Sequence, residues 1–125
     1  NKCDYCVEHH FAGLKRLLDD DALSQGLRSA MEAGDIAAAP LDDAQKLALD
    51  YARMLTLDPA SLREDMIITL RDSGYSDGEI LEINQVTAYF NYANRTVLGL
   101  GCSTDGDILG LSPNKSEDPD NWSHT

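Results

Sequence analysis

Apolar residues recur at helical spacing along almost all of this chain, and the run from 77 to 100 shows the pattern best. Six of them follow one another at intervals of three or four: Ile83, Val86, Phe90, Ala93, Val97 and Leu100. This spacing places them on one face of an α-helix. Ser76 and Glu79 form a capping-box pattern before the run, and Gly101 follows it as a helix-ending residue. We therefore expect one long central core helix, whose stripe also suits packing between subunits.

The first half of the chain predicts three shorter helices. The first covers about 2–18 and the second about 22–31. An Ala-rich stretch over 35–40 ends in proline and reads as a linker. The third helix is expected to start near Asp42 or Asp43, because apolar positions again step by three and four from there.

A fourth short helix is expected before the long one. The Asp-Pro pair at 58–59 ends the third helix, since proline disfavours a helical residue before it. Ser61 and Glu64 form a further capping-box pattern, which predicts the start of the fourth helix, and Gly74 suits its end. No alternating strand pattern of useful length appears, so we predict an all-α fold.

Composition separates a core from a tail and excludes several classes of partner. We expect a helical core over 1–111 and an irregular tail over 112–125, where Ser, Pro, Asn and Asp dominate. The 125 residues include 22 acidic and 10 basic side chains, a formal net charge of −12. A surface this negative repels phosphate backbones and anionic lipids. No apolar run approaches the roughly 20 residues of a membrane span. We therefore expect neither nucleic acid nor a membrane as partner.

The residues with the clearest chemistry stand at the start of the chain. Cys3, Cys6 and His10 are separated by three and four positions, so a helix brings them to one face. One sulfur can then attack an oxidant as a thiolate while the other closes a disulfide. A helix N-terminus and a neighbouring imidazole both favour the thiolate. His9 is three positions from Cys6 and is the weaker candidate.

Other interpretations of the cysteines stay open at this point. A Cys-x-x-Cys pair also occurs in zinc sites, and His9 or His10 together with Cys102 could supply the further ligands. The pair could equally be packed and inert. Cys102 has no motif partner and reads as a bystander. Three cysteines with one close pair are not typical of a secreted disulfide framework, so we expect a cytoplasmic protein.

The motif resembles the signature of the alkylhydroperoxidase D-like family, within the carboxymuconolactone decarboxylase superfamily. The stretches 1–10, 76–83, 88–95 and 99–101 resemble the peroxidase-related branch of this family. The resemblance covers most of the chain up to about Asp105, and the combination is more specific than any single motif.

This resemblance implies an all-helical bundle that assembles as a homo-oligomer and reduces peroxides without metal or organic cofactor. It implies that Cys6 is the peroxidatic cysteine, that Cys3 is the more accessible partner that forms and exchanges the disulfide, and that His10 belongs to a proton relay. A dithiol or a protein would serve as reductant. Alternatives are a protein disulfide-exchange partner on the same fold and a non-catalytic helical oligomer or zinc-binding module.

The chain departs from the family pattern in one respect. The family relay also uses a glutamate about one helical segment before the first cysteine, and that position would precede Asn1. We expect that this chain lacks the N-terminal helices of the family. Glu8 does not match the relay position by motif, although it is close enough to act on the thiols electrostatically.

Overall fold

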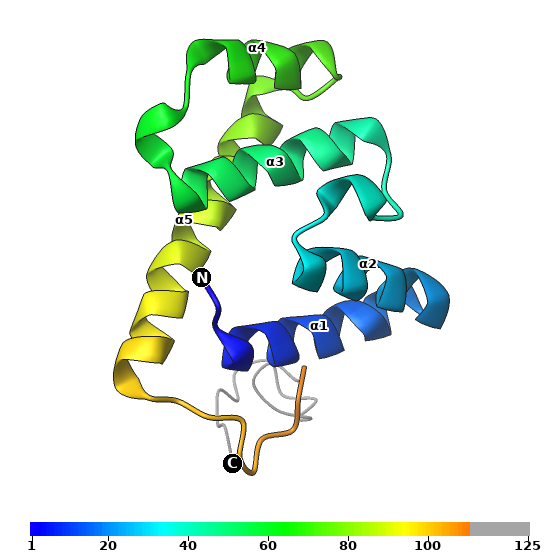
Figure 1. Ribbon diagram of the computed structural model, residues 1–125, viewed down its shortest axis with the longest axis vertical. Coiled ribbons are helices and arrows are strands. Elements are labelled where there is room, and N and C mark those ends of the chain that lie inside the picture. The colour runs from blue at the N-terminus through cyan, green and yellow to red at the C-terminus, as the bar shows by residue number, and fades with distance from the viewer. Residues whose placement is uncertain (111–125) are drawn as a thin grey trace.

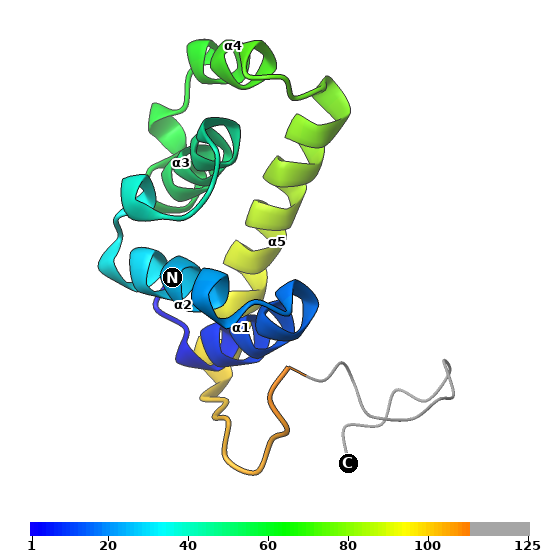
Figure 2. The ribbon, with the colours of Figure 1, turned by 90° about the vertical axis from the view of Figure 1, so that its right-hand side faces the viewer.

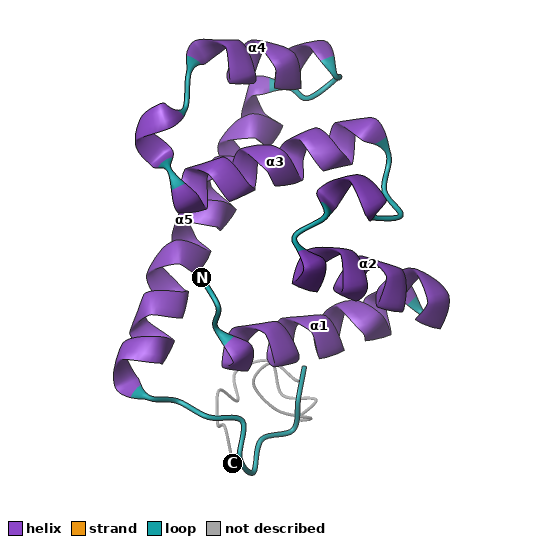
Figure 3. Ribbon diagram, viewed as in Figure 1, coloured by secondary structure: helices purple, strands orange, loops and turns teal. Residues whose placement is uncertain are grey.

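The computed structural model describes residues 1–110, which form five α-helices and two 3₁₀ turns (Figure 1). The elements are α1 (Asp4–Leu18), α2 (Asp21–Ala33), η1 (Ile36–Ala38), α3 (Asp43–Leu57), η2 (Pro59–Ser61), α4 (Glu64–Asp72) and α5 (Asp77–Leu100). No strand occurs between residues 1 and 110, so the predicted all-α fold is confirmed (Figure 3). The predicted tail over 112–125 lies outside the described residues. Within the same part of the chain, no helix combines the length and apolar character that crossing a membrane requires.

The main core lies where α3, α4 and α5 meet. Tyr51, Leu70 and Ile80, one from each helix, are its buried side chains. The Tyr51 hydroxyl accepts a hydrogen bond from Asn84 Nδ2 at 2.6 Å, so this buried polar atom is satisfied. Partly buried apolar side chains surround the three: Leu47, Ala48, Leu55, Leu62, Met66, Ile67, Tyr75 and Ile83. The core anchors the first half of α5 and thereby sets the direction of its second half.

Helices α1 and α2 pack against each other as a hairpin, and α1 contacts α5 (Figure 2). Asp19 reverses the chain in a left-handed conformation, with φ at 49°. Asp20 caps α2 by accepting a hydrogen bond from Leu23 N at 2.9 Å. The fully buried Ser24 donates its hydroxyl to the Asp20 carbonyl at 2.6 Å. The run of aspartates therefore ends one helix and starts the next.

The long helix follows its predicted boundaries, but its apolar stripe is not buried throughout. Ser76 and Glu79 form the capping box, and Gly101 ends the helix with φ at 68°. Ile80 lies in the core, whereas Val86 is 55% exposed and Leu100 is 76% exposed. The prediction of a central core helix is confirmed at Ile80 and Ile83, which join the main core, and wrong at Val86 and Leu100, which stay largely exposed.

The fourth helix begins later than its sequence pattern predicts. Arg63 is the N-cap of α4 and makes no capping hydrogen bond with its side chain. Ser61 instead lies in the 3₁₀ turn and donates its hydroxyl to the Asp58 carboxylate. The Ser61–Glu64 capping box was therefore a wrong prediction, because the turn after Pro59 engages the serine first.

After α5, the chain turns back along α1 (Figure 1). Arg16 donates a hydrogen bond to the Leu109 carbonyl at 3.3 Å. Gly110, with φ at 72°, lies so close to α1 that an added Cβ would come within 2.5 Å of Gly13 N. Glycine is therefore needed at 110 both for its backbone conformation and for space. We refer to residues 102–110 as the return segment.

The two serine-to-glutamate patterns give a matched stability test. Ser76→Ala removes a capping box, so we expect the free energy of unfolding to fall by about 1 kcal/mol. Ser61→Ala removes the same hydroxyl from the same sequence pattern where no helix cap exists, and we expect a smaller loss. Urea denaturation followed by circular dichroism measures both. Equal losses would contradict the assigned caps.

Candidate dithiol site

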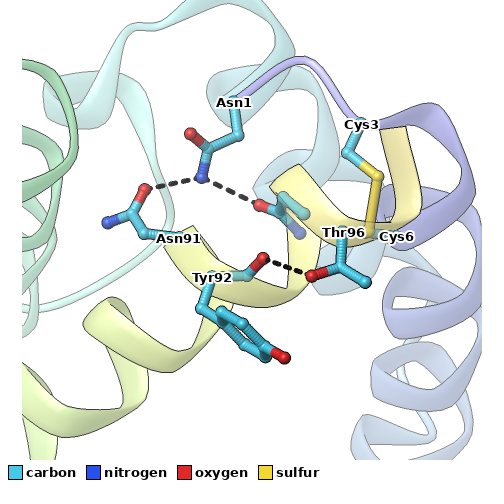
Figure 4. Close-up of a disulfide and its surroundings, with 7 residues drawn as sticks. Asn1, Cys3, Cys6, Asn91, Tyr92 and Thr96 are labelled. Atoms are coloured by element: carbon cyan, nitrogen blue, oxygen red, sulfur yellow. Dashed lines mark hydrogen bonds between the residues drawn. A yellow bond between two sulfur atoms is a disulfide. The ribbon is translucent and has the colours of Figure 1, made fainter. Parts of the chain in front are cut away.

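Cys3 and Cys6 form a disulfide at the start of α1 (Figure 4). Their Cα atoms are 5.4 Å apart, within the usual range for disulfides. Cys3 is the N-cap residue, with an extended backbone at φ −105° and ψ 93°, and Cys6 is the third residue of the helix. The helix thus begins two residues later than predicted. The two sulfurs nevertheless lie within bonding reach, as the spacing indicated.

The two cysteines differ in exposure. Cys3 is only 3% exposed, whereas Cys6 is partly exposed. The resemblance implied that Cys3 is the more accessible of the two, and this oxidised form has the opposite order. Figure 4 shows the disulfide beside the second half of α5, with Thr96 drawn close to Cys6.

An asparagine cluster fastens the segment before Cys3 to α5 and α3. Asn1 Nδ2 donates to Asn91 Oδ1 at 2.7 Å and to Asn94 Oδ1 at 2.9 Å, as Figure 4 shows for Asn91. Asn91 Nδ2 in turn donates to Thr56 Oγ1 of α3 at 3.1 Å. Arg95 donates to the Asn91 carbonyl at 2.6 Å. These polar residues of α5 therefore make hydrogen bonds within the fold.

His10 follows Cys6 by one helical turn. Its ring is exposed and meets Phe90 edge to face, with ring centroids 4.7 Å apart and planes at 87°. Its ring nitrogens make no hydrogen bond to any residue between 1 and 110. The imidazole is therefore positioned by an apolar contact and keeps both nitrogens available for proton transfer.

His9 has a different environment, on the side of α1 that faces the return segment. Its Nε2 lies 2.9 Å from Asp107 Oδ2, and its ring lies against Tyr5 with centroids 4.5 Å apart. Burial raises the pKa of the Tyr5 hydroxyl above 10.0, and the nearby charges of Asp107 and Cys102 raise it further. Asp107 could not be predicted from the sequence, because it lies 98 residues from its partner. The contact between Tyr5 and His9 could have been predicted, because the two residues are separated by one helical turn.

Glu8 forms its ion pair with a residue of α2. Arg28 donates to both of its carboxylate oxygens, at 2.5 and 3.2 Å, and also to Glu32 at 2.7 Å. The guanidinium further lies 4.8 Å from the centre of the Phe11 ring. The hydrogen bonds from Arg28 hold the pKa of Glu8 below 4.5. A carboxylate neutralised in this way is a poor proton acceptor, so Glu8 does not stand in for the relay glutamate.

The third cysteine and the histidines do not form a metal site with the disulfide. Cys102 is exposed and unbridged. Within the described part of the chain, no group of three or more His, Cys, Asp or Glu side chains is arranged to hold a metal ion.

An open groove runs between α3 and α5, with one side chain of α2 and the first residue of the chain also in its lining. Its volume is about 990 Å³. Most of its lining is apolar: Asn1, Met31, Ala48, Leu49, Ala52, Thr56, Tyr75, Glu79, Glu82, Ile83, Val86, Thr87, Phe90 and Asn94. Phe90 also contacts His10, and Asn1 is two residues from Cys3. The groove therefore adjoins the dithiol site through Phe90 and Asn1, whereas Cys3, Cys6 and His10 do not line it.

Comparison with known proteins adds no assignment: no protein-family model, curated protein or solved structure matches this chain.

The Glu8–Arg28 pair predicts a pH-dependent contribution to stability. Because the pKa of Glu8 is lowered in the folded state, the pair stabilises the fold above about pH 4.5 and loses its effect as the pH falls through the folded pKa. We expect Glu8→Gln to lower the free energy of unfolding at pH 7 by at most about 1 kcal/mol, since the pair is partly exposed. The difference from wild type should shrink in acid.

Urea denaturation at pH 7 and pH 3 measures this difference. Glu82→Gln is the matched control, because Glu82 has no ion-pair partner within residues 1–110. A deficit in Glu8→Gln that is as large at pH 3 as at pH 7 would contradict the assignment.

Proposed function

We propose that this protein is a thiol-dependent peroxidase of the alkylhydroperoxidase type, with Cys6, Cys3 and His10 as its reacting groups. The observation that carries the proposal is a cysteine pair within bonding reach at a helix N-terminus, with an imidazole one turn later. Helix N-termini favour thiolates, and thiolates are the form that attacks peroxides. The resemblance of four stretches to the peroxidase-related family supports the same reaction.

The proposed oxidative half begins with the dithiol form. The Cys6 thiolate attacks the outer peroxide oxygen, an S–O bond forms, and the O–O bond breaks. Cys6 becomes a sulfenic acid, and the peroxide leaves as an alkoxide. The alkoxide takes from His10 the proton that the imidazole had accepted from the Cys6 thiol, and an alcohol results. The Cys3 thiolate then attacks the sulfenic sulfur, forming the disulfide and releasing hydroxide, which is protonated to water.

The proposed reductive half returns two electrons from a dithiol or protein reductant. Its thiolate attacks one sulfur of the disulfide, and the other sulfur leaves as a thiolate. The more exposed sulfur belongs to Cys6, whereas Cys3 is buried. Cys3 also occupies the N-cap and makes no capping hydrogen bond in the disulfide. As a thiolate it can accept hydrogen bonds from the first amides of α1, and a stabilised thiolate leaves faster. We therefore assign attack to Cys6 and departure to Cys3.

The partners and setting of this reaction follow from the same proposal. A recyclable disulfide needs a reducing compartment, so we expect the protein to act in the cytoplasm. The exposed apolar side chains in the second half of α5, among them Tyr89 and Tyr92, support assembly as a homo-oligomer.

A second candidate is disulfide exchange with another protein, with slow peroxide chemistry. The partial exposure of Cys6 favours it, because an incoming protein thiol must reach the sulfur. Comparing the rate of dithiol oxidation by peroxide with that by an oxidised protein separates the two. A much faster protein reaction would replace the peroxidase assignment.

The peroxidase assignment predicts that Cys6→Ala abolishes peroxide consumption. Without that thiolate no sulfur remains to attack oxygen at the assigned position. Peroxide loss in the presence of dithiothreitol measures the rate. Cys102→Ala is the matched control, because it removes an exposed thiol outside the disulfide, and we expect it to keep the wild-type rate. An unchanged rate in Cys6→Ala would end the proposal.

The same assay can compare variants of the two adjacent histidines. His10→Gln should slow peroxide reduction by about 10²–10⁴-fold if His10 transfers the proton. His9→Gln disturbs the contact with Asp107 and should slow it much less. The reverse ranking would assign the proton transfer to His9.

The assignment of the reductive half predicts where a thiol adds first. Oxidised Cys102→Ala protein, treated briefly with glutathione and quenched with N-ethylmaleimide, should carry glutathione on Cys6 and maleimide on Cys3. We expect at least about a tenfold excess of this product over the one with the two adducts exchanged, because Cys6 is partly exposed whereas Cys3 is buried. Fragment mass spectrometry locates both adducts. Glutathione found mainly on Cys3 would contradict the assignment.

A further inference from the structure

Lys2, the residue before Cys3, has a backbone conformation that residues with a side chain rarely adopt. Its φ is 53°, in the left-handed region, and Asp19 at the end of α1 is the only other non-glycine residue between 1 and 110 with a positive φ. This conformation is unfavourable for any residue that carries a Cβ. It persists only where the surrounding contacts impose it. The contacts on either side of Lys2 must therefore hold it in place.

Two restraints act on the three residues that precede α1. On one side, Asn1 Nδ2 donates to Asn91 Oδ1 at 2.7 Å and to Asn94 Oδ1 at 2.9 Å, both on α5. We refer to these three residues as the asparagine cluster. On the other side, the disulfide joins Cys3 to Cys6. Asn94 is 8% exposed and Cys3 is 3% exposed, so both restraints end in buried parts of the fold. The residue between them has to bridge two fixed points.

The hydrogen bonds of the asparagine cluster and the disulfide favour each other. Forming the hydrogen bonds orders residues 1–3, which leaves less conformational freedom to lose when the disulfide closes. Closing the disulfide orders the same residues, so the hydrogen bonds then form at a smaller entropic cost. Such coupling is reciprocal. A change that weakens the hydrogen bonds must therefore also shift the equilibrium from the disulfide toward the dithiol.

We propose that the asparagine cluster positions Cys3 for bonding to Cys6 and thereby stabilises the disulfide, and that the strained backbone of Lys2 limits this stabilisation. The strain opposes it because the backbone can relax whenever the hydrogen bonds or the disulfide open. The effect on the dithiol equilibrium stands on these contacts alone. Its role in the reaction rests on the proposed function, in which Cys3 must reach the sulfenic acid on Cys6.

The equilibrium with glutathione measures the stabilisation of the disulfide directly. Oxidised glutathione converts the dithiol into the disulfide and yields two molecules of reduced glutathione, so the exchange needs no other reactant. All proteins carry Cys102→Ala, which leaves Cys3 and Cys6 as the only cysteines. After equilibration at pH 7 without oxygen and an acid quench, maleimide labelling and mass spectrometry give the ratio of dithiol to disulfide. This ratio and the glutathione concentrations give the equilibrium constant for disulfide formation.

Asn1→Ala removes the donor of both hydrogen bonds at an exposed position, where folding tolerates the change. We expect the equilibrium constant for disulfide formation to fall at least about threefold, the effect of one weak hydrogen bond. Gln85→Ala is the matched control, because it removes an exposed side-chain amide from the first half of α5, and it should leave the constant unchanged. An unchanged constant in Asn1→Ala overturns the positioning role.

Glycine at position 2 should change the constant in the opposite direction. Lys2→Gly and Lys2→Ala both remove the ammonium group, but only glycine adopts the left-handed conformation without strain. We expect the constant of Lys2→Gly to exceed that of Lys2→Ala at least about twofold, since glycine also gains freedom when the contacts open. Asp19→Gly and Asp19→Ala are the matched controls, because Asp19 has φ at 49° at the other end of α1, and their constants should be equal. A constant of Lys2→Gly no higher than that of Lys2→Ala overturns the role of Lys2.

A trapping experiment connects this inference to the peroxidase. During reaction with tert-butyl hydroperoxide, added dimedone competes with Cys3 for the sulfenic acid on Cys6. Asn1→Ala should raise the dimedone-labelled fraction at least about threefold, because Cys3 is then less often in position, whereas Gln85→Ala should not. The two proposals can fail separately. A lowered equilibrium constant in Asn1→Ala without any peroxide turnover rejects the peroxidase and keeps the positioning role. Peroxide turnover by the wild type together with an unchanged constant in Asn1→Ala rejects the positioning role and keeps the peroxidase.

Discussion

The attachment of the start of α1 to the second half of α5 is the contact on which the site depends. Cys3, the N-cap of α1, is buried, and hydrogen bonds from Asn1, two residues before it, to Asn91 and Asn94 fasten the chain to α5. The core of α3, α4 and α5 is far from this point, so it fixes α5 but does not reach the cysteines. A few polar contacts and the disulfide therefore determine how the dithiol residues are arranged. The apolar core determines only the direction of α5.

Local patterns predicted the helices well where the interactions that form them are local. The capping box at Ser76 uses residues three apart, and the predicted boundaries of α5 were confirmed. Ser61 has the same pattern and failed, because a competing local partner, Asp58, is equally close in sequence. The apolar stripe of α5 was read correctly as helical. Its burial depends on which other helices pack against it. The spacing of apolar residues does not show this, so it could not predict how much of the stripe is buried.

The candidate site likewise combines contacts between residues that are close in sequence with contacts between residues that are far apart. Cys3, Cys6 and His10 are neighbours on one helix, so their spacing was sufficient to predict a close cysteine pair with an imidazole nearby. The partners that distinguish His10 from His9 come from elsewhere in the chain. Phe90 contacts one ring and Asp107 the other, and each depends on how α5 and the return segment meet α1. Arg28 likewise neutralises Glu8 from a separate helix. Such pairings follow only from the assembled fold.

These long-range contacts pair two of the acidic groups near the dithiol residues, in a chain that carries a formal net charge of −12. Arg28 neutralises Glu8, and Asp107 faces His9 on the other side of α1. Asp4, between the two cysteines in the first turn of α1, makes no ion pair within residues 1–110. Because a free carboxylate next to a thiol opposes its ionisation, Asp4 acts against the effect of the helix N-terminus, whereas the pairing of Glu8 removes a second such charge. Phe90 meets the ring of His10 and also lines the groove, so the imidazole adjoins an apolar side chain. The surroundings of His10 are therefore determined by α5, a helix that is distant from it in sequence.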